Sequence, residues 1–189
     1  MKNVAMFFLI LIFFNSKSNA QWQLMNGPYS GIVNSFAVED SIIIASTLGW
    51  NSTFASANDG NSWKKLSEYV FQVESFVISN NNIYSTLNGV SVSIDTGQTW
   101  IPRNNGLPSG SLKKLVLNGN DLFAGTSDNG VYLSHDYGNS WTGINNGLTN
   151  HTILSLAVWD STIVAGTDTG GIFVSRDYGS SWAAANNGL

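Results

Sequence analysis

The stretch Ser175-Arg176-Asp177-Tyr178-Gly179-Ser180-Ser181-Trp182 decides how this chain folds, because variants of it occur four times. The other copies span 134–141, 93–100 and 56–63, and all four follow the pattern Ser-x-Asp/Asn-x-Gly-x-Ser/Thr-Trp. We call them the motif turns. Trp63, Trp100, Trp141 and Trp182 are separated by 37, 41 and 41 residues, and Asn-Asn-Gly-Leu recurs at 104–107, 145–148 and 186–189. A fixed period of this length indicates a repeat architecture.

Each repeat contains four short apolar runs broken by turn residues, which is the pattern of β-strands. The fourth repeat is the clearest, with strands expected over 153–159, 162–165, 172–175 and 181–184. The same pattern places strands in the earlier repeats over 32–38, 42–45, 54–56 and 62–66; over 76–78, 83–85, 90–93 and 99–102; and over 115–117, 122–125, 131–134 and 140–143.

Four antiparallel strands in a unit of this length are typical of a propeller blade. The fold class predicted is therefore all-β, with about four four-stranded blades over 30–66, 71–103, 111–144 and 152–185. A single blade cannot bury both of its faces, so neighbouring blades must stack.

The motif residues have the chemistry of a tight turn. The Asp or Asn side chain accepts hydrogen bonds from backbone N–H groups of its own turn. The Gly two positions later permits a positive φ. The Trp buries a large apolar area between blades while its indole N–H finds an acceptor.

With four copies in phase over 22–189, the chain resembles the Asp-box (BNR) repeat β-propellers. That family includes sialidases, sortilin-type receptors, xyloglucan-cleaving glycoside hydrolases and photosystem II assembly factors. The resemblance implies that each motif joins the third and fourth strands of a blade at the outer rim, away from the axis where ligands bind. It therefore implies structural roles, and no catalytic ones, for Ser56, Asn58, Gly60, Trp63, Ser93, Asp95, Gly97, Trp100, Ser134, Asp136, Gly138, Trp141, Ser175, Asp177, Gly179 and Trp182.

The number of repeats bears on whether the ring is closed. Propellers of this type close with about six to eight blades, and this sequence holds four. We therefore expect an incomplete, unclosed ring, with the missing blades in a longer chain. Residues 21–29, which include Trp22 without a preceding motif, are expected to form a lone strand that closes the last blade of a full ring.

The N-terminus has the features of a secretory signal peptide over 1–20. Lys2 precedes an apolar run over 4–14, and the segment ends in Ser18-Asn19-Ala20. Because the apolar run is too short to span a bilayer, we expect cleavage, no membrane span afterwards, and a secreted location: extracellular, periplasmic or at the cell surface. The chain has no Cys, 12 acidic and 8 basic residues and a net charge of −4. Without a basic stripe, nucleic acid is not an expected partner.

No catalytic or metal centre emerges from the residue pattern. Ser134-His135-Asp136 has the order of a triad, but adjacent strand residues point to opposite faces. The two histidines, His135 and His151, have no metal-ligand spacing, so no metal and no cofactor is expected. Arg103 and Arg176 are too few for the arginine triad of a sialidase. The acids outside the motif pattern fall mostly in turns and loops, where we expect them to be solvated: Glu39, Asp40, Asp59, Glu68, Glu74, Asp121, Asp128, Asp160 and Asp168.

The face opposite the motif turns is the expected place for function, because the loops between second and third strands gather there with the loops between blades. Candidate ligand-binding residues on this face are Tyr29, Trp50, Asn51, Asn88, Asp128, His151 and Asp168. The sequence favours an exported, non-catalytic binding or scaffold module for a protein or carbohydrate ligand. The alternative is a fragment of a secreted, xyloglucanase-like glycoside hydrolase whose catalytic carboxylates lie partly outside this chain. An assembly factor for a membrane complex is a third reading.

Overall fold

The computed structural model describes residues 32–48, 52–66, 73–86 and 88–189, which form strands and turns but no helix. The expected signal peptide, the expected strand over 21–29, and Tyr29, Trp50 and Asn51 lie outside these residues. The strands form four antiparallel sheets, each in chain order. Their bounds are, for blade 1, β1 (Ile32–Glu39), β2 (Ile42–Leu48), β3 (Ser52–Ser56) and β4 (Lys64–Lys65); for blade 2, β5 (Phe76–Ser79), β6 (Asn82–Ser85), β7 (Ser91–Ser93) and β8 (Ile101–Pro102); for blade 3, β9 (Leu112–Asn118), β10 (Asp121–Thr126), β11 (Val131–Ser134) and β12 (Thr142–Gly143); and for blade 4, β13 (Ile153–Trp159), β14 (Thr162–Thr167), β15 (Ile172–Ser175) and β16 (Ala183–Ala184).

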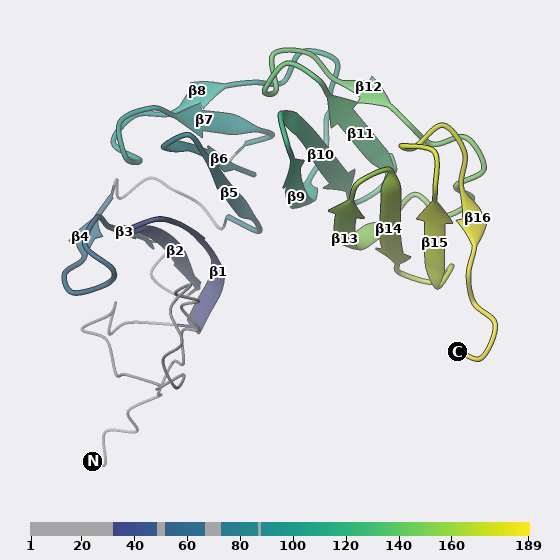
Figure 1. Ribbon diagram of the computed structural model, residues 1–189, viewed down its shortest axis with the longest axis horizontal. Coiled ribbons are helices and arrows are strands. Elements are labelled where there is room, and N and C mark those ends of the chain that lie inside the picture. The colour runs from purple at the N-terminus through teal and green to yellow at the C-terminus, as the bar shows by residue number, and fades with distance from the viewer. Residues whose placement is uncertain (1–31, 49–51, 67–72, 87) are drawn as a thin grey trace.

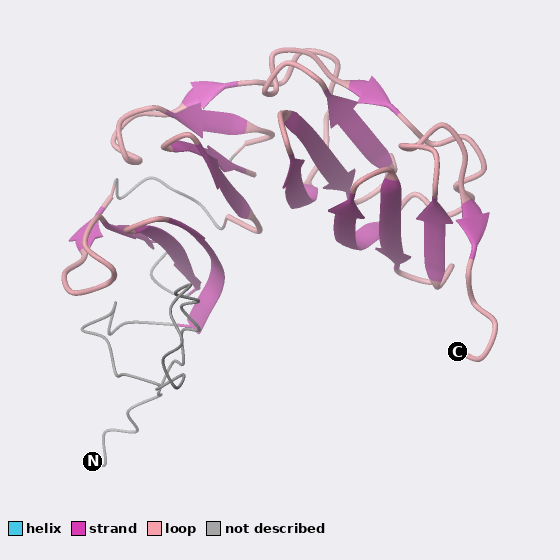
Figure 2. Cartoon of the chain, in the orientation of Figure 1, coloured by secondary structure: helices cyan, strands magenta, loops and turns pink. Residues whose placement is uncertain are grey.

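The four blades stand side by side along an arc (Figure 1). The first strand of each blade lies on the concave side of the arc and the short fourth strand on the convex side, and loops join the blades (Figure 2). The first and last blades do not meet. The predicted fold class, an all-β and unclosed propeller of four four-stranded blades, is therefore confirmed.

The hairpin between the first two strands of each blade is a tight turn. Asp40, Asn80, Asn81 and Asp160 adopt φ values between 49° and 62° there, and Gly119 has φ 59°. Asn, Asp and Gly tolerate this left-handed region better than other residues. In blade 4 the turn sets a register in which Leu156 pairs with Ala165, with a bulge between Ile153 and Ser155. Blade 1 repeats this bulge between Val33 and Ser35.

The fourth strand is shorter than the sequence indicated. We expected runs of four or five residues, such as 181–184, but each fourth strand has only two residues. The reason is local. The backbone N–H of Ser181 donates to Asp177 Oδ1 at 2.9 Å, so the start of the expected strand remains in the motif turn.

The core lies between the blades. The cluster between blades 3 and 4 includes Phe123, Leu133, Leu156, Phe173 and Trp182, all buried. Similar clusters join blades 1 and 2, and blades 2 and 3. Full burial of a side chain such as Phe123 stabilises the fold by about 1.5–3 kcal/mol. Stacking of the blades thus buries the apolar core, as expected for a repeat fold. No helix of the described residues is long and apolar enough to cross a membrane.

Candidate functional site

Each motif turn is held by hydrogen bonds within its own eight residues. In blade 3, Asp136 Oδ1 accepts from the backbone N–H of Ser140 at 2.8 Å and from the hydroxyl of Ser134 at 2.7 Å. Asp136 Oδ2 accepts from the Ser140 hydroxyl at 2.6 Å. The Ser134 oxygen in turn accepts from Gly138 N at 2.7 Å, where φ is 85°. Both carboxylate oxygens are therefore occupied inside the turn.

The other motif turns repeat this network. Hydrogen bonds from the Thr99 hydroxyl and N–H lower the pKa of Asp95 to about 2. Hydrogen bonds from the Ser140 hydroxyl and N–H lower the pKa of Asp136 to about 2, and those from Ser181 lower the pKa of Asp177 to about 2. In the first turn Asn58 replaces the acid: its Oδ1 accepts from Ser62 N at 2.9 Å and its Nδ2 donates to the Ser62 hydroxyl at 2.9 Å. A carboxylate saturated in this way is a poor general acid or base at neutral pH.

The Asn-Asn-Gly-Leu segments, which the sequence singled out without a role, clamp the loops between second and third strands. We call them linkers 1, 2 and 3, at 104–107, 145–148 and 186–189. In linker 2, Asn145 Oδ1 accepts from Val131 N at 2.7 Å while its Nδ2 donates to Asn129 O at 3.1 Å. Asn104 and Asn186 make the same pair of bonds in blades 2 and 4. In blades 2, 3 and 4 the loop between the second and third strands is therefore bonded to a linker asparagine at two backbone positions.

The linkers also receive the tryptophan of the next blade. Trp141 donates from its backbone N to Asn105 O and from its indole to Arg103 O, both at 2.9 Å. Trp182 donates in the same way to Asn146 O at 2.9 Å and to Ile144 O at 2.6 Å. Trp141 and Trp182 are both buried in the clusters between blades. Trp63 and Trp100 are half-buried, and their indole N–H groups have no hydrogen-bond partner among the described residues.

Three of the predicted ligand-binding residues lie in one row on the face opposite the motif turns. The carbonyl of His151 accepts from Gly130 N at 2.9 Å, which joins His151 to the loop that carries Asp128. Asp168 N donates to Thr152 O at 3.1 Å, next to His151 in the chain. All three side chains are exposed. Asn88, also exposed, lies apart from them in blade 2, where its carbonyl accepts from Asn104. We call Asp128, His151 and Asp168 the loop row.

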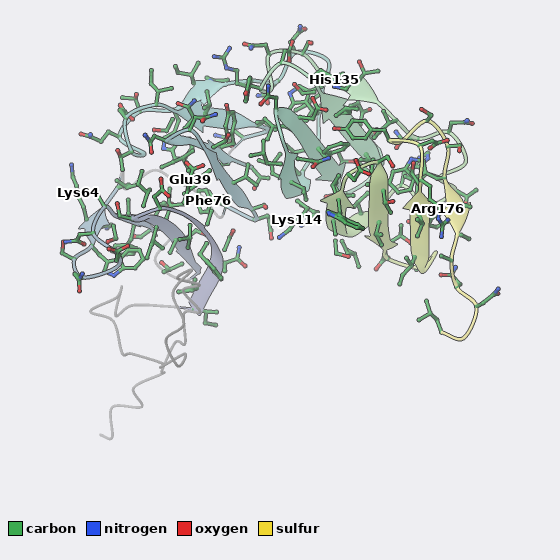
Figure 3. The ribbon with its side chains drawn as sticks, viewed as in Figure 1. Glu39, Lys64, Phe76, Lys114, His135 and Arg176 are labelled. Atoms are coloured by element: carbon green, nitrogen blue, oxygen red, sulfur yellow. The ribbon has the colours of Figure 1, made fainter. Side chains whose placement is uncertain are left out.

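A cluster that the sequence did not predict lies on the motif-turn side, between blades 3 and 4. Asp121 Oδ1 is 2.9 Å from His135 Nδ1, and Asp121 Oδ2 accepts from the hydroxyl of Tyr178. The rings of His135 and Tyr178 stack with centroids 6.3 Å apart. Burial, and then the bond to Asp121, raises the pKa of Tyr178 to about 12. The contacts of His135 are thus with Asp121 and Tyr178. Figure 3 shows it on the convex side of the arc.

Hollows also occur on the motif-turn side. One of about 380 Å³ lies between blades 2 and 3 and is lined by Tyr84, Ile94, Arg103, Tyr137 and Asn139. Arg103 donates to Asn139 across it, and burial raises the pKa of Tyr84. A second hollow of about 380 Å³ lies between the motif turns of blades 1 and 2.

Two acidic side chains connect neighbouring blades. Glu39 accepts from the backbone N–H groups of Asn80 and Asn81 at 3.2 and 3.0 Å, so it caps the hairpin of blade 2 (Figure 3). Glu74 pairs with Lys113 of blade 3 at 3.5 Å. Among the described residues, no group of three or more His, Cys, Asp or Glu side chains could hold a metal ion.

Comparison with known proteins supports the fold. No family model matches this chain, and no curated protein sequence matches it. Among solved structures, the computationally designed protein Ika4 is 12% identical with a TM-score of 0.64, covering 81% of this chain and 95% of Ika4. The GH74 xyloglucanase from Xanthomonas campestris is 18% identical with a TM-score of 0.62, covering 89% of this chain and 32% of the enzyme. YCF48 bound to D1 peptide is 12% identical with a TM-score of 0.64, covering 86% of this chain and 57% of YCF48. The chain thus spans only part of the two natural proteins, and at these identities the likeness establishes the propeller fold.

Proposed function

We propose that this chain is a non-catalytic binding or scaffold module of an exported protein, built from Asp-box repeats. The observation that carries the proposal is the rigid loop face opposite the motif turns. Linker asparagines fix the backbone of loops that present exposed polar side chains, and binding residues are commonly carried by loops on a rigid scaffold.

Within this proposal the loop row is the ligand site. Asp128, His151 and Asp168 combine two carboxylates with an imidazole on neighbouring loops. Such groups accept hydrogen bonds from sugar hydroxyls or from the donors of a peptide. Both ligand classes remain candidates, because one similar structure is an enzyme named for xyloglucan and another was solved with a bound peptide.

The state of the acids argues against catalysis by the described residues. Glycoside hydrolysis needs two carboxyl groups facing a cleft about 5–10 Å apart. The motif aspartates are saturated inside their turns, Glu39 caps a hairpin, and Glu74 pairs with Lys113. The second candidate is a piece of a glycoside hydrolase whose catalytic carboxylates lie partly outside this chain. It is favoured by the GH74 match, in which this chain covers about a third of the enzyme.

Binding to arrays of xyloglucan oligosaccharides and of immobilised peptides tests the proposal. Asp128→Asn combined with Asp168→Asn is expected to abolish capture of any array member that the chain binds. Arg176→Ala is the matched control, since Arg176 is an exposed charge on the motif side (Figure 3). Equal loss with both variants, or no loss with the double variant, would reject the loop row as the site. Release of reducing sugar from xyloglucan by the chain would reject the non-catalytic reading.

A further inference from the structure

The hollow between blades 2 and 3 has a counterpart in the junction between blades 3 and 4. In blade 2, Tyr84 of β6 pairs with Val92 of β7, and both residues line the hollow. In blade 3, Phe123 of β10 pairs with Leu133 of β11 in the same register. The repeat therefore relates each residue of the hollow to one residue of the next junction.

The two junctions differ in the acid that they hold. Asp121 begins β10, and its Oδ2 accepts from the hydroxyl of Tyr178. The corresponding residue at the start of β6 is Asn82. Tyr137 has the same place in its motif turn as Tyr178, and it lines the hollow together with Asn82. The hollow thus keeps the tyrosine but lacks the carboxylate that receives its hydroxyl one junction later.

The hollow has instead gained a cation. Arg103 corresponds to Ile144, because its backbone N–H donates to Val90 O at 2.7 Å and that of Ile144 donates to Val131 O at 2.9 Å. Arg103 Nη1 donates to the side-chain oxygen of Asn139, and Arg103 Nε is buried without an acceptor among the described residues. No acidic side chain of the described residues forms an ion pair with Arg103. Its positive charge therefore faces the hollow without a counterion.

The remaining lining of the hollow suits a small hydroxylated ligand. Asn82 and Asn139 contribute side-chain amides, which both donate and accept hydrogen bonds, as sugar hydroxyls do. Burial raises the pKa of Tyr84, so its hydroxyl stays protonated at neutral pH and can donate. Ile94, which is 66% exposed, adds an apolar surface. The volume of about 380 Å³ lies within the range of small-molecule sites.

We propose that the hollow between blades 2 and 3 binds the carboxylate of a small hydroxylated acid of the sugar-acid class. The Arg103 guanidinium and the Tyr137 hydroxyl donate to this carboxylate, as Tyr178 donates to Asp121 in the next junction. Hydrogen bonds between a guanidinium and a carboxylate are charge-assisted and therefore strong. The hollow lies on the motif-turn side, opposite the loop row, so this site and the loop row stand or fall separately.

Titration of the ¹⁵N-labelled chain with galacturonate, followed by NMR, tests this site. Galacturonate is expected to shift the side-chain amide signals of Asn82 and Asn139 in a saturable way. Galactose is the matched neutral probe and is expected to bind at least about 10-fold more weakly, because it lacks the carboxylate. Equal affinities for the two sugars would overturn the role of the carboxylate.

Reciprocal substitutions in the two junctions locate the site. Asn82→Asp places in the hollow the acid that Asp121 supplies to the next junction, so it is expected to weaken galacturonate binding by at least about 10-fold through repulsion and competition for Arg103. Arg103→Met should cause a similar loss, while its backbone bonds to Val90 and Trp141 remain. Asp121→Asn is the matched control and should leave the affinity unchanged. Thermal unfolding of each variant establishes that it is folded.

The remaining outcomes separate this site from other modes of binding. Wild-type affinity in Asn82→Asp, or an equal loss in Asp121→Asn, would overturn the assignment to the hollow. Shifts confined to Asp128, His151 and Asp168 would place galacturonate on the loop row and overturn it as well. A response to tetraglutamate that exceeds the response to galacturonate would overturn the sugar-acid class in favour of acidic peptides. The absence of any shift with galacturonate would overturn the proposal.

Discussion

Trp182 donates its backbone N–H to the carbonyl oxygen of Asn146 at 2.9 Å, across 36 residues of chain. The bond joins the motif turn of blade 4 to the linker that leaves blade 3. Trp141 and Asn105 make the same contact one blade earlier. The two recurring features of the repeat, the tryptophan and the asparagine pair, are therefore parts of one junction, which accounts for the 41 residues that separate successive copies of each in blades 3 and 4.

The first asparagine of a linker should matter more than the second. Asn145→Ala removes two bonds to the loop of blade 3 and leaves Val131 N without its acceptor. We expect a loss of about 1–3 kcal/mol in the free energy of unfolding, measured by urea denaturation. Asn146→Ala keeps the carbonyl that Trp182 uses and removes only an exposed bond to Ser180 O, so a loss below about 0.5 kcal/mol is expected. Equal losses for the two variants would mean that the hydrogen bonds from the Asn145 side chain to the loop of blade 3 do not stabilise the fold.

The glycine of linker 2 should be intolerant of any side chain. Gly147→Ala places a methyl group against the Trp182 carbonyl and also meets a positive φ. Gly119→Ala meets only the positive φ, which costs about 1–2 kcal/mol. We expect Gly147→Ala to lower the unfolding midpoint well beyond the Gly119→Ala variant. Equal unfolding midpoints for the two variants would mean that the Trp182 carbonyl does not pack tightly against Gly147.

The contribution of the Trp182 indole hydrogen bond to stability can be measured by comparison with Trp100, whose indole N–H has no acceptor among the described residues. Trp182→Phe removes the donor to Ile144 O, whereas Trp100 has no acceptor among the described residues. Both substitutions reduce side-chain volume, so the difference between their unfolding free energies reports the hydrogen bond together with the greater burial of Trp182. We expect Trp182→Phe to cost about 0.5–1.5 kcal/mol more than Trp100→Phe. A difference of zero or of opposite sign would contradict the assigned bond.

Acid should weaken the three motif turns that contain aspartate. Their pKa values are lowered to about 2 in the folded chain, below the ordinary aspartate value of 3.8. A lowered pKa contributes stability above the unfolded value, and that contribution is lost as pH falls from about 4 to about 2. Carboxyl chemical shifts followed in a pH titration should give pKa values of about 2 for Asp95, Asp136 and Asp177.

The first motif turn supplies the control for this prediction, because Asn58 forms the same turn without a charge. Asp136→Asn is therefore expected to keep the turn of blade 3 while reducing the loss of stability between pH 4 and pH 2. Asp136→Ala removes both acceptors and should destabilise the chain at neutral pH as well. An Asp136→Asn variant as unstable as Asp136→Ala would contradict this reading of the turn.

Alkali should loosen the contact between blades 3 and 4. The pKa of Tyr178 is raised to about 12 by burial and by the neighbouring carboxylate of Asp121. A raised pKa contributes stability that is complete below the unfolded value near 10 and is lost as pH rises towards 12. Thermal unfolding across this interval should show the loss in the wild type and a smaller loss in Tyr178→Phe. An identical pH dependence in both proteins would remove Tyr178 as the cause.

The blade and its turns could be predicted from the sequence, because they depend on residues close together in the chain. The motif places Asp136 within four residues of both its main partners, Ser134 and Ser140, and Gly138 at a positive φ. Alternating apolar residues fixed most strands, though the motif turn retained residues that we had given to the fourth strand. That the ring stays open after four blades was also predictable, from the count of motifs.

The contacts between blades could not be predicted in the same way, because they join residues far apart in the chain. The Asp121–Tyr178 contact joins residues 57 apart, and nothing in the local pattern distinguishes Asp121 from other hairpin acids. The role of the linker asparagines was hidden for the same reason, since their partners lie 14 to 16 residues away on a loop. Burial by a neighbour is a property of stacking, and the stacking of blades is set by contacts that no single repeat contains.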